Sequence, residues 1–415
     1  MIPDAFLFYF ASMQFQSIIG QKDTKEQLVQ LVQHNRLSHA LLFLGKEGTG
    51  ALSLALAFAQ YIVCEKVNGK QAMETSLFGE PDPVSSIQYP ASSTDSCGTC
   101  PACIKANQLI HPDIHFSYPV ITKKPGEKPI STDFIKEWRE FISSNPYGNV
   151  YDWLQFIDAE NKQGNITANE CNDIIRKLNL KSFESEYKIL ILWMPEFLGK
   201  EGNKLLKLIE EPPPNTLFIF VAENDALVLP TILSRTQLIK IPVLTKLEVE
   251  AALELRDGIP IEKAHQIAAI SEGNYREARQ LMQNAEDDWQ LLLRDWLNLI
   301  FKKNLVDQAK WIEETAKLGR EKQKQFLKYF SHLLEQAIRA RVIHAGSDQQ
   351  TMAREHDFAL RLNKLCTLGQ QEAIINELDK ASYYIERNAN AKMLFQALSI
   401  RLYHIINNKS LILMD

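Results

Sequence analysis

Residues 40–63 read ALLFLGKEGTGALSLALAFAQYIV, and this stretch decides the fold of the N-terminal part of the chain. The first six residues form a short apolar run that ends in glycine, which is typical of a buried parallel strand. Residues 51–63 are rich in Leu and Ala and contain neither Pro nor Gly, so they predict a helix. A strand, a glycine loop and a helix in this order form the setting in which a loop of this kind binds phosphate.

The glycine loop keeps the spacing of a phosphate-binding loop but not its chemistry. Gly45 and Gly50 stand five positions apart, as in the pattern G-x-x-x-x-G-K-[ST], with Gly48 between them. Glycines let backbone N–H groups approach a phosphate closely. Ala51 and Leu52 stand where the pattern has a lysine and a hydroxyl, so the loop lacks a charge and a magnesium ligand. From the loop alone, an ordinary glycine turn in an α/β sheet remains an equal alternative.

Two further strands are predicted at 188–192 (KILIL) and 217–221 (LFIFV). In a phosphate-loop ATPase the first of them ends in acids that hold magnesium and activate water. Here Trp193 and Met194 follow the strand, and Glu196 is the first acid. Because the loop lysine and the strand-end acids are both missing, we expect no ATP hydrolysis. Strands that alternate with helices predict an α/β fold with a doubly wound parallel sheet.

Size and composition indicate a globular protein of two or three domains. The chain has 415 residues, with 45% hydrophobic and 23% charged residues. The net charge of -5 argues against a free-standing DNA-binding protein, which usually carries a basic excess. No apolar run is long enough for a membrane span, and residues 1–15 lack the basic flank of a signal peptide. We therefore expect a cytoplasmic location, where clustered cysteines favour metal binding over disulfides.

Residues 97–103 read CGTCPAC, and the C-x-x-C-x-x-C spacing lets three thiolates turn toward one tetrahedral zinc ion. The fourth ligand is expected at the end of the helix that follows the glycine loop, with His111 as the alternative. The expected zinc ligands are Cys64, Cys97, Cys100 and Cys103. Buried free thiols and an iron–sulfur cluster are the other readings of the triplet. The isolated Cys171 and Cys366 are expected to be ordinary core thiols.

The second half of the chain is predicted to be helical. Strand patterns cease at about Leu244, and three short helical stretches separated by Gly258 and Gly273 follow up to residue 287. Residues 288–415 carry apolar stripes at spacings of three and four, which are most often the core of a helical bundle. The stripes are Trp289, Leu293, Trp296, Leu297 and Ile300, then Phe326, Leu327, Phe330, Leu333, Leu334 and Ala337.

Five stretches together carry a resemblance to a known family. They are RLSHALLFLGKEGTG (36–50), CGTCPAC (97–103), HPDIHF (111–116), NKLLKLIEEPPPNTLFIFV (203–221) and TILSRT (231–236). In this order they closely resemble the delta-prime subunits of the bacterial DNA polymerase III clamp loader, which are AAA+ proteins. The resemblance covers most of the chain, and it implies a domain plan. The implied domains are an AAA+ (P-loop NTPase-like) domain at 1–243 with an inserted zinc module around 64–103, a small helical lid at 244–287, and an all-α collar at 288–415.

The resemblance implies a structural subunit that does not hydrolyse ATP and helps to load the sliding clamp onto primed DNA during replication. Such a chain is no enzyme by itself but part of the DNA-directed DNA polymerase III holoenzyme. Its implied partners are motor subunits of the gamma/tau type, a delta subunit, the sliding clamp and, through the complex, primed DNA, with no membrane. Zinc is the implied cofactor. ATP is expected to bind weakly or not at all at the degenerate loop of Gly45, Gly48 and Gly50. The alternatives are a working AAA+ motor ATPase and a zinc-bearing DNA-binding module.

Two arginines gain possible roles from the resemblance. Arg235 is implied to be an arginine finger, which reaches the ATP of a neighbouring motor subunit and stabilises charge on the phosphate. From the sequence alone, an arginine in a loop that pairs with a carboxylate remains open. Arg276 matches the second sensor position of the lid, where a structural or solvent-facing role is equally open. Relative to the short form of the family, residues 65–96 and about 122–165 are insertions. Their Gly, Pro, Ser and Asn clusters predict surface loops.

Overall fold

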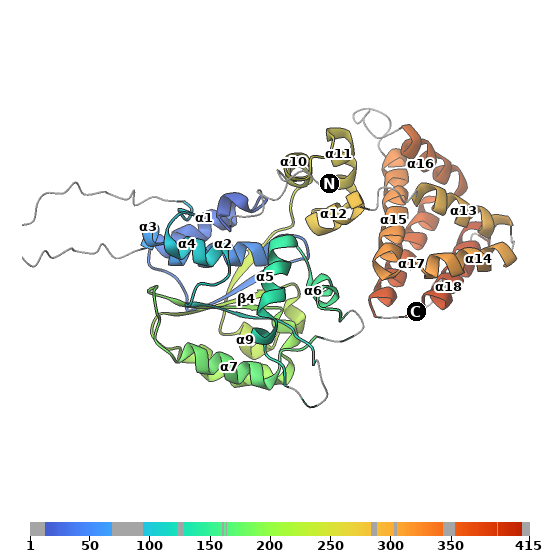
Figure 1. The fold of residues 1–415 in the computed structure, drawn as a ribbon. Helices are drawn as coiled ribbons and strands as arrows, with labels where there is room; N and C mark the ends of the chain where they lie inside the picture. The colour runs from blue at the N-terminus through green and yellow to red at the C-terminus, as the bar shows by residue number, and fades with distance from the viewer. Residues whose placement is uncertain are drawn as a thin grey trace, which may run out of the picture. The chain divides into compact units, whose positions relative to one another are not determined.

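The structure is a computed structural model. It describes residues 13–68, 94–122, 126, 128–159, 162, 164–283, 289–302, 305–342, 353–387 and 389–408. The chain divides into two compact units, Met1–Arg279 and Gln280–Asp415 (Figure 1). The finer division into three domains with boundaries after residues 243 and 287 stays a prediction.

The first unit is built on a sheet of five parallel strands. The strands are β1 (Ala40–Gly45), β2 (Ile114–Ser117), β3 (Lys188–Trp193), β4 (Thr216–Ala222) and β5 (Gln237–Ile241). Their order is β2-β3-β4-β1-β5, and every neighbouring pair is parallel. In this register Leu42 of β1 lies opposite Phe220 of β4 and Leu238 of β5. The predicted parallel sheet and its three predicted strands are confirmed, and β2 and β5 are the two edge strands.

Helices cover both faces of this sheet. They are α1 (Lys22–Gln33), α2 (Ala51–Val63), α3 (Glu65–Asn68), α4 (Pro101–Asn107), α5 (Ile135–Ser144), α6 (Val150–Phe156), α7 (Ala168–Leu178), α8 (Leu206–Glu210) and α9 (Pro230–Leu233). Short 3-10 helices are η2 (Phe15–Ser17), η3 (Ser131–Phe134), η4 (Pro195–Phe197), η5 (Gly199–Leu205) and η6 (Asp225–Leu227). The stretch before the three prolines, residues 199–210, forms η5 followed by α8. After β5, the helices α10 (Lys246–Asp257), α11 (Ile261–Ile270) and α12 (Tyr275–Gln283) match the three predicted short helices.

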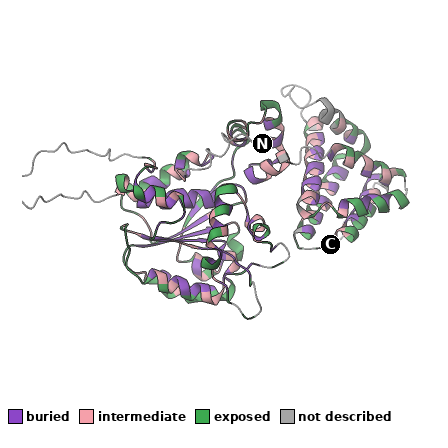
Figure 2. Ribbon diagram, in the orientation of Figure 1, coloured by how far each residue is buried: buried purple, intermediate pink, exposed green. Residues whose placement is uncertain are grey.

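Successive side chains of each strand enter opposite cores, because side chains alternate across a strand. Leu41 and Ile191 belong to a core formed with α2, α4, α5 and α6. Leu42 and Leu190 belong to a second core formed with α7, α8 and α9. All residues of α2 are buried, as expected for a helix that is apolar on every side. Figure 2 shows the buried strands in purple, with the purple α2 among the helices that cover one face of the sheet. The sheet is therefore doubly wound, as predicted.

The expectation of surface loops over residues 122–165 is wrong for residues 131–156. This part forms η3, α5 and α6, and its Trp138, Phe141 and Trp153 are almost fully buried. The Trp138 ring stacks on Tyr118 with centroids 4.0 Å apart. Apolar residues at helical spacing therefore outweigh the turn-forming residues that flank them. Most of the other predicted insertion lies outside the described residues, since only 65–68 and 94–96 are described.

The second unit contains helices of a bundle. They are α13 (Trp289–Lys302), α14 (Leu305–Ala316), α15 (Arg320–Val342), α16 (Ala353–Leu365), α17 (Leu368–Glu386) and α18 (Ala391–Asn408). Both predicted apolar stripes are buried, and Trp296 stacks on Trp311 of α14 with centroids 5.0 Å apart. Among the described helices of the whole chain, none combines the length and apolar character needed to cross a membrane.

Candidate functional site

The glycine loop lies between β1 and α2, and its conformation depends on two glycines. Gly48 and Gly50 have φ of +73° and +83°, a region that favours glycine. A Cβ on Gly50 would lie 2.6 Å from Cε1 of Tyr147, and a Cβ on Gly48 would lie 1.8 Å from Oδ1 of Asn274. The glycines thus allow close approach to the loop, as predicted. The groups that approach are side chains of the chain itself.

The space in front of the loop is small. The cavity lined by the loop, Tyr147, Trp193 and Glu223 has a volume of about 20 Å³. This is room for about one water molecule. Small-molecule sites usually measure roughly 300–1,000 Å³. The loop therefore has no room for a nucleotide in this conformation.

The positions that lack catalytic groups are filled by apolar side chains. Ala51 and Leu52 are buried at the start of α2. Trp193, at the end of β3, is also buried, and its ring centroid lies 5.3 Å from that of Trp138. Glu196 accepts hydrogen bonds from the backbone N–H groups of Glu223 and Asn224 at 2.7 and 2.9 Å. Its carboxylate thus holds the turn after β4, and burial raises its pKa.

Arg276, the sensor-like arginine, is buried and paired with two carboxylates. Its Nε and Nη2 donate to Asp152 at 2.5 and 2.6 Å, and its Nη1 donates to Glu47 of the glycine loop at 2.7 Å. Asn149 and Asn274 also donate to Glu47, at 2.9 and 3.3 Å. This group of five residues is called the Arg276 cluster below. Of the two readings left open for Arg276, the structure favours the structural one over the solvent-facing one.

Glu223 lies at the carboxyl end of β4 and lines the same small cavity. Burial and the nearby Glu47 and Glu196 together raise the pKa of its carboxyl group to about 8, although Arg276 opposes them. Carboxylates in a confined space disfavour each other's ionised form. The end of the sheet where magnesium would bind thus holds a carboxyl group that is partly neutral near neutral pH.

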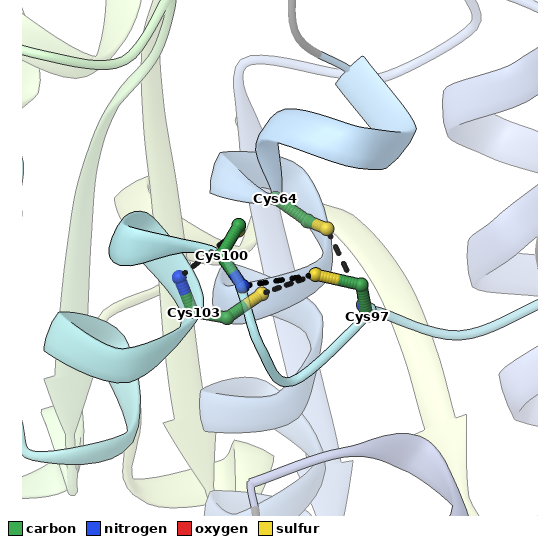
Figure 3. Close-up of side chains that lie close together, drawn as sticks. All are labelled: Cys64, Cys97, Cys100 and Cys103. Atoms are coloured by element: carbon green, nitrogen blue, oxygen red, sulfur yellow. Dashed lines mark hydrogen bonds between the residues drawn. The ribbon is translucent and has the colours of Figure 1, made fainter. Parts of the chain in front are cut away.

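The four predicted zinc ligands lie together at the end of α2 and the start of α4 (Figure 3). Their sulfur atoms all lie within 4.8 Å of one another, and the Cys97 and Cys103 sulfurs are 3.8 Å apart. A tetrahedral site with Zn–S bonds of about 2.3 Å places its sulfurs about 3.8 Å apart. His111 is not part of this group of ligand atoms within the described residues. It lies buried, with its Nδ1 accepting the backbone N–H of Asp113.

Backbone N–H groups point at the sulfurs, as in a site built for thiolates. Cys97 Sγ accepts from the N–H groups of Thr99 and Cys100 at 3.4 and 3.3 Å. Cys64 Sγ accepts from the Cys97 N–H at 3.3 Å, and Cys100 Sγ from the Cys103 N–H at 3.4 Å. A hydrogen bond from the Cys103 side chain lowers the pKa of Cys64 to about 5, against burial, and the same contact raises the pKa of Cys103. The donor set therefore fits a metal such as zinc, whose thiol ligands must be deprotonated.

Arg235 lies in the turn between α9 and β5. Its hydrogen bonds are to residues outside the Arg276 cluster. Its Nε and Nη2 donate to Glu210 at 2.6 and 2.5 Å, and its Nη1 donates to the carbonyl of Thr231 at 2.8 Å. The side chain is 33% exposed. The carboxylate pairing that the sequence left open is thus present. Its role toward a neighbouring subunit stays a prediction.

Sequence reasoning missed the residues that fill the nucleotide site. Tyr147, Asn149 and Asp152 follow a stretch of turn residues, and Asn149 and Asp152 form a capping box at the start of α6. The N-x-x-D spacing is a local signal for a helix start. It does not reveal that the helix start lies against a loop about a hundred positions earlier in the chain.

Comparison with known proteins finds similar sequences among subunits of DNA polymerase III. The model of the family described as DNA polymerase III, delta subunit, matches residues 20–77 and 149–245. The chain is 26% identical over 259 residues to DNA polymerase III subunit delta' of Bacillus subtilis. This alignment covers 62% of this chain and 58% of the relative. It is 23% identical over 282 residues to DNA polymerase III subunit tau of the same organism. This second alignment covers 66% of this chain and 38% of the relative. The matches thus span less than two thirds of either relative.

The matched regions contain the glycine loop, β1, β3, β4 and Arg235, which carry the fold of the first unit. Curated relatives named delta' and tau or gamma/tau subunits match this chain at similar identity, between 23% and 26%. Together with the doubly wound parallel sheet, these matches support a chain of the DNA polymerase III clamp-loader type, in agreement with the resemblance in the sequence.

Proposed function

We propose that the chain is a delta-prime-type subunit of a DNA polymerase III clamp loader, which takes part in loading the sliding clamp onto primed DNA without hydrolysing ATP. The observation that carries the proposal is the glycine loop, whose cavity of about 20 Å³ has no room for a nucleotide. Ala51, Leu52 and Trp193 stand where the lysine, the hydroxyl and an acid would be needed. A subunit of this kind contributes structure and side chains to the motor subunits beside it.

Arg235 is the side chain that we propose to act on a neighbouring gamma/tau-type motor subunit. Its guanidinium is permanently charged and can donate two parallel N–H groups to one acceptor group, and in this structure Nε and Nη2 both donate to one carboxylate oxygen, Oε1 of Glu210. Because both side chains are partly exposed, the pair costs little to separate. A triphosphate carries more negative charge than one carboxylate, so it would compete with Glu210 for the guanidinium N–H groups of Arg235. The assembly would also include a delta subunit.

The four clustered cysteines are proposed to hold one structural zinc ion. All four ligand positions come from the chain, which leaves no open position for a reacting group. The ion would fix the start of α4 against the end of α2. Asp95, two residues before Cys97, accepts the N–H groups of Phe15 and Gln16 at 2.9 Å each. The metal would thereby also hold the segment that precedes α1.

The proposed function is tested by measuring ATP binding and turnover with the purified chain alone, and then its assembly with the motor and delta subunits. We expect no turnover by the chain alone and incorporation into the loader. Turnover that co-purifies with the chain and is lost in Gly50→Val would assign it to the motor type instead. DNA binding by the chain alone that weakens steeply with salt would favour the DNA-binding alternative.

A further inference from the structure

We propose that residues 135–156, here called the plug, occupy the place of a nucleotide and fasten α12 to the glycine loop. The plug comprises α5, α6 and the turn between them. The inference rests on the proposed function in one respect, namely that the loop binds no nucleotide. It goes further because it assigns a task to a segment that the sequence indicates only as an insertion.

Aromatic packing anchors the plug to the end of β3. Trp138 of α5 lies 5.3 Å from both Trp153 of α6 and Trp193 of β3, measured between ring centroids. Phe141 lies 5.4 Å from Trp153 and 6.3 Å from Trp193. All four side chains are buried. Trp193 is thus both the residue that replaces a strand-end acid and the surface on which the plug is built.

The turn of the plug lies directly on the glycine loop. Tyr147 approaches Gly50 so closely that no side chain fits there, and the Ser53 hydroxyl donates to the carbonyl of Pro146. The Tyr147 hydroxyl accepts the backbone N–H of Ile19 at 2.8 Å. Since Tyr147 is itself buried, its ring fills space that would otherwise be open to a ligand.

The charge at the site is also satisfied from within the chain. A buried arginine beside a glycine loop is suited to bind phosphate oxygens. Here Asp152 of the plug takes two N–H groups of Arg276, and Glu47 takes a third. Asn149 positions both carboxylates, because it donates to Glu47 at 2.9 Å and forms the capping box with Asp152. Two carboxylates therefore supply the negative charge that a nucleotide would supply.

The same contacts hold α12 against the loop. Tyr275 donates its backbone N–H to the carbonyl of Gly48 at 3.2 Å, and its ring meets that of Tyr147 edge to face at 5.0 Å. A ligand that binds between two elements couples their positions by its affinity for both. In this chain the plug takes the place of such a ligand, and it is always present because it is part of the polypeptide. The position of α12 should therefore not respond to nucleotide.

The family comparison divides the plug, because α6 lies within the matched stretch 149–245 and α5 lies outside it. Residues 78–148 lie between the two stretches that the family model matches, and they include α5 and Tyr147. The part of the plug that packs on Trp193 and covers Gly50 is thus outside the matched family sequence.

The test is hydrogen–deuterium exchange of the full chain, read at the α12 amides from Tyr275 to Arg279. In the unaltered chain we expect slow exchange that millimolar Mg-ATP does not change. In Asp152→Asn, which removes the charge but keeps the shape, we expect exchange at least about tenfold faster, because a buried arginine then loses a charged partner. Asp158→Asn is the matched control, since Asp158 is an exposed acid two residues after the end of the plug.

The strand amides of β1 and β4 report whether each variant remains folded. If Asp152→Asn does not fold, Arg276→Lys gives the same readout, because lysine keeps the charge but cannot fork onto Asp152. The inference is overturned if Mg-ATP slows exchange of α12 in the unaltered chain, or if Asp152→Asn exchanges like Asp158→Asn. Neither result depends on assembly with other subunits, so failure of the plug and failure of the proposed function are distinguishable.

Discussion

Trp193 stands at the carboxyl end of β3, where an ATPase needs a carboxylate to hold magnesium. Its indole is buried against Trp138, and the residue after it, Met194, has a φ of +59°. A carboxylate introduced at this position would be surrounded by aromatic rings and would lose its hydration. One residue therefore removes a metal ligand and also creates a packing surface. Replacing Trp193 by an acidic residue would therefore not by itself restore a magnesium site.

Glu223 gives a prediction about stability and pH. Its pKa is raised to about 8 by burial and by nearby carboxylates, against about 4.3 for an unperturbed glutamate. Between these values the folded chain binds more protons than the unfolded chain, so this group lowers stability as pH rises from about 4.5 to about 8. Glu223→Gln should therefore stabilise the fold at pH 8 by about 1–3 kcal/mol and have little effect near pH 4.5. We place the gain in the lower part of that range because the residue is only half-buried.

Urea unfolding of the first unit at both pH values measures this difference. Glu140→Gln is the matched control, because it makes the same substitution at an exposed glutamate of α5 that does not line the cavity. An unchanged pH slope in Glu223→Gln would mean that the carboxyl group titrates normally in the folded chain.

Among the elements, α4 depends most on a group beyond its own sequence. It has seven residues, begins at Pro101 after the N-cap Cys100, and carries Cys103 in its first turn. A helix of this length is marginal without tertiary contacts. We predict one zinc ion per chain. Removing it by a chelator should speed amide exchange in α4 and in Phe15–Ser17, which Asp95 holds, but not in the central strands.

Metal analysis of Cys64→Ser checks the ligand assignment. We expect its zinc content to fall well below that of the unaltered chain, whereas Cys171→Ser, which removes a buried thiol outside the group, should keep its zinc. Full zinc occupancy in Cys64→Ser would point to His111 as the fourth ligand. A chain purified without chelator that contains no zinc would contradict the metal centre as a whole.

The elements also show which parts of the fold could be predicted from the sequence. Strand β1 and helix α2 have the predicted bounds, and helices α10, α11 and α12 are separated at Gly258 and Gly273 as predicted, because local apolar runs and glycine stops mark these elements. The edge strands β2 and β5 are short and carry no such apolar run. The cysteines could be grouped because metal-ligand spacing is a local pattern.

The contents of the nucleotide site could not be predicted in the same way. The missing lysine and acids are visible in the sequence, and the loss of ATP hydrolysis that they predict stays a prediction. The contacts of Tyr147 with Gly50 and of Asp152 with Arg276 join segments far apart in the chain. Turn residues beside Tyr147 favoured a surface loop, whereas burial of Trp138 and Trp153 determined the position of the segment.

At the scale of the whole molecule, each unit has its own apolar core, so a change on the surface of one should leave the other intact. Arg235 is such a surface site. Its partly exposed pair with Glu210 is worth at most about 1 kcal/mol, so Arg235→Ala should keep both the fold and the assembly with partner subunits. What it should change is the chemistry of a neighbouring subunit.

We predict that a reconstituted loader carrying Arg235→Ala hydrolyses ATP more slowly than the unaltered loader when the clamp and primed DNA are present. An arginine supplied in trans is worth roughly 10³–10⁵ in rate at a single dependent GTPase site. The loss for the whole complex should be far smaller, because this chain would serve only one of several motor sites. Arg176→Ala is the matched control, since Arg176 is a 75% exposed arginine of α7 with one carboxylate partner. If Arg235→Ala assembles normally and hydrolyses ATP at the rate of the control, Arg235 does no more than pair with Glu210, and the chain contributes only structure to the ring.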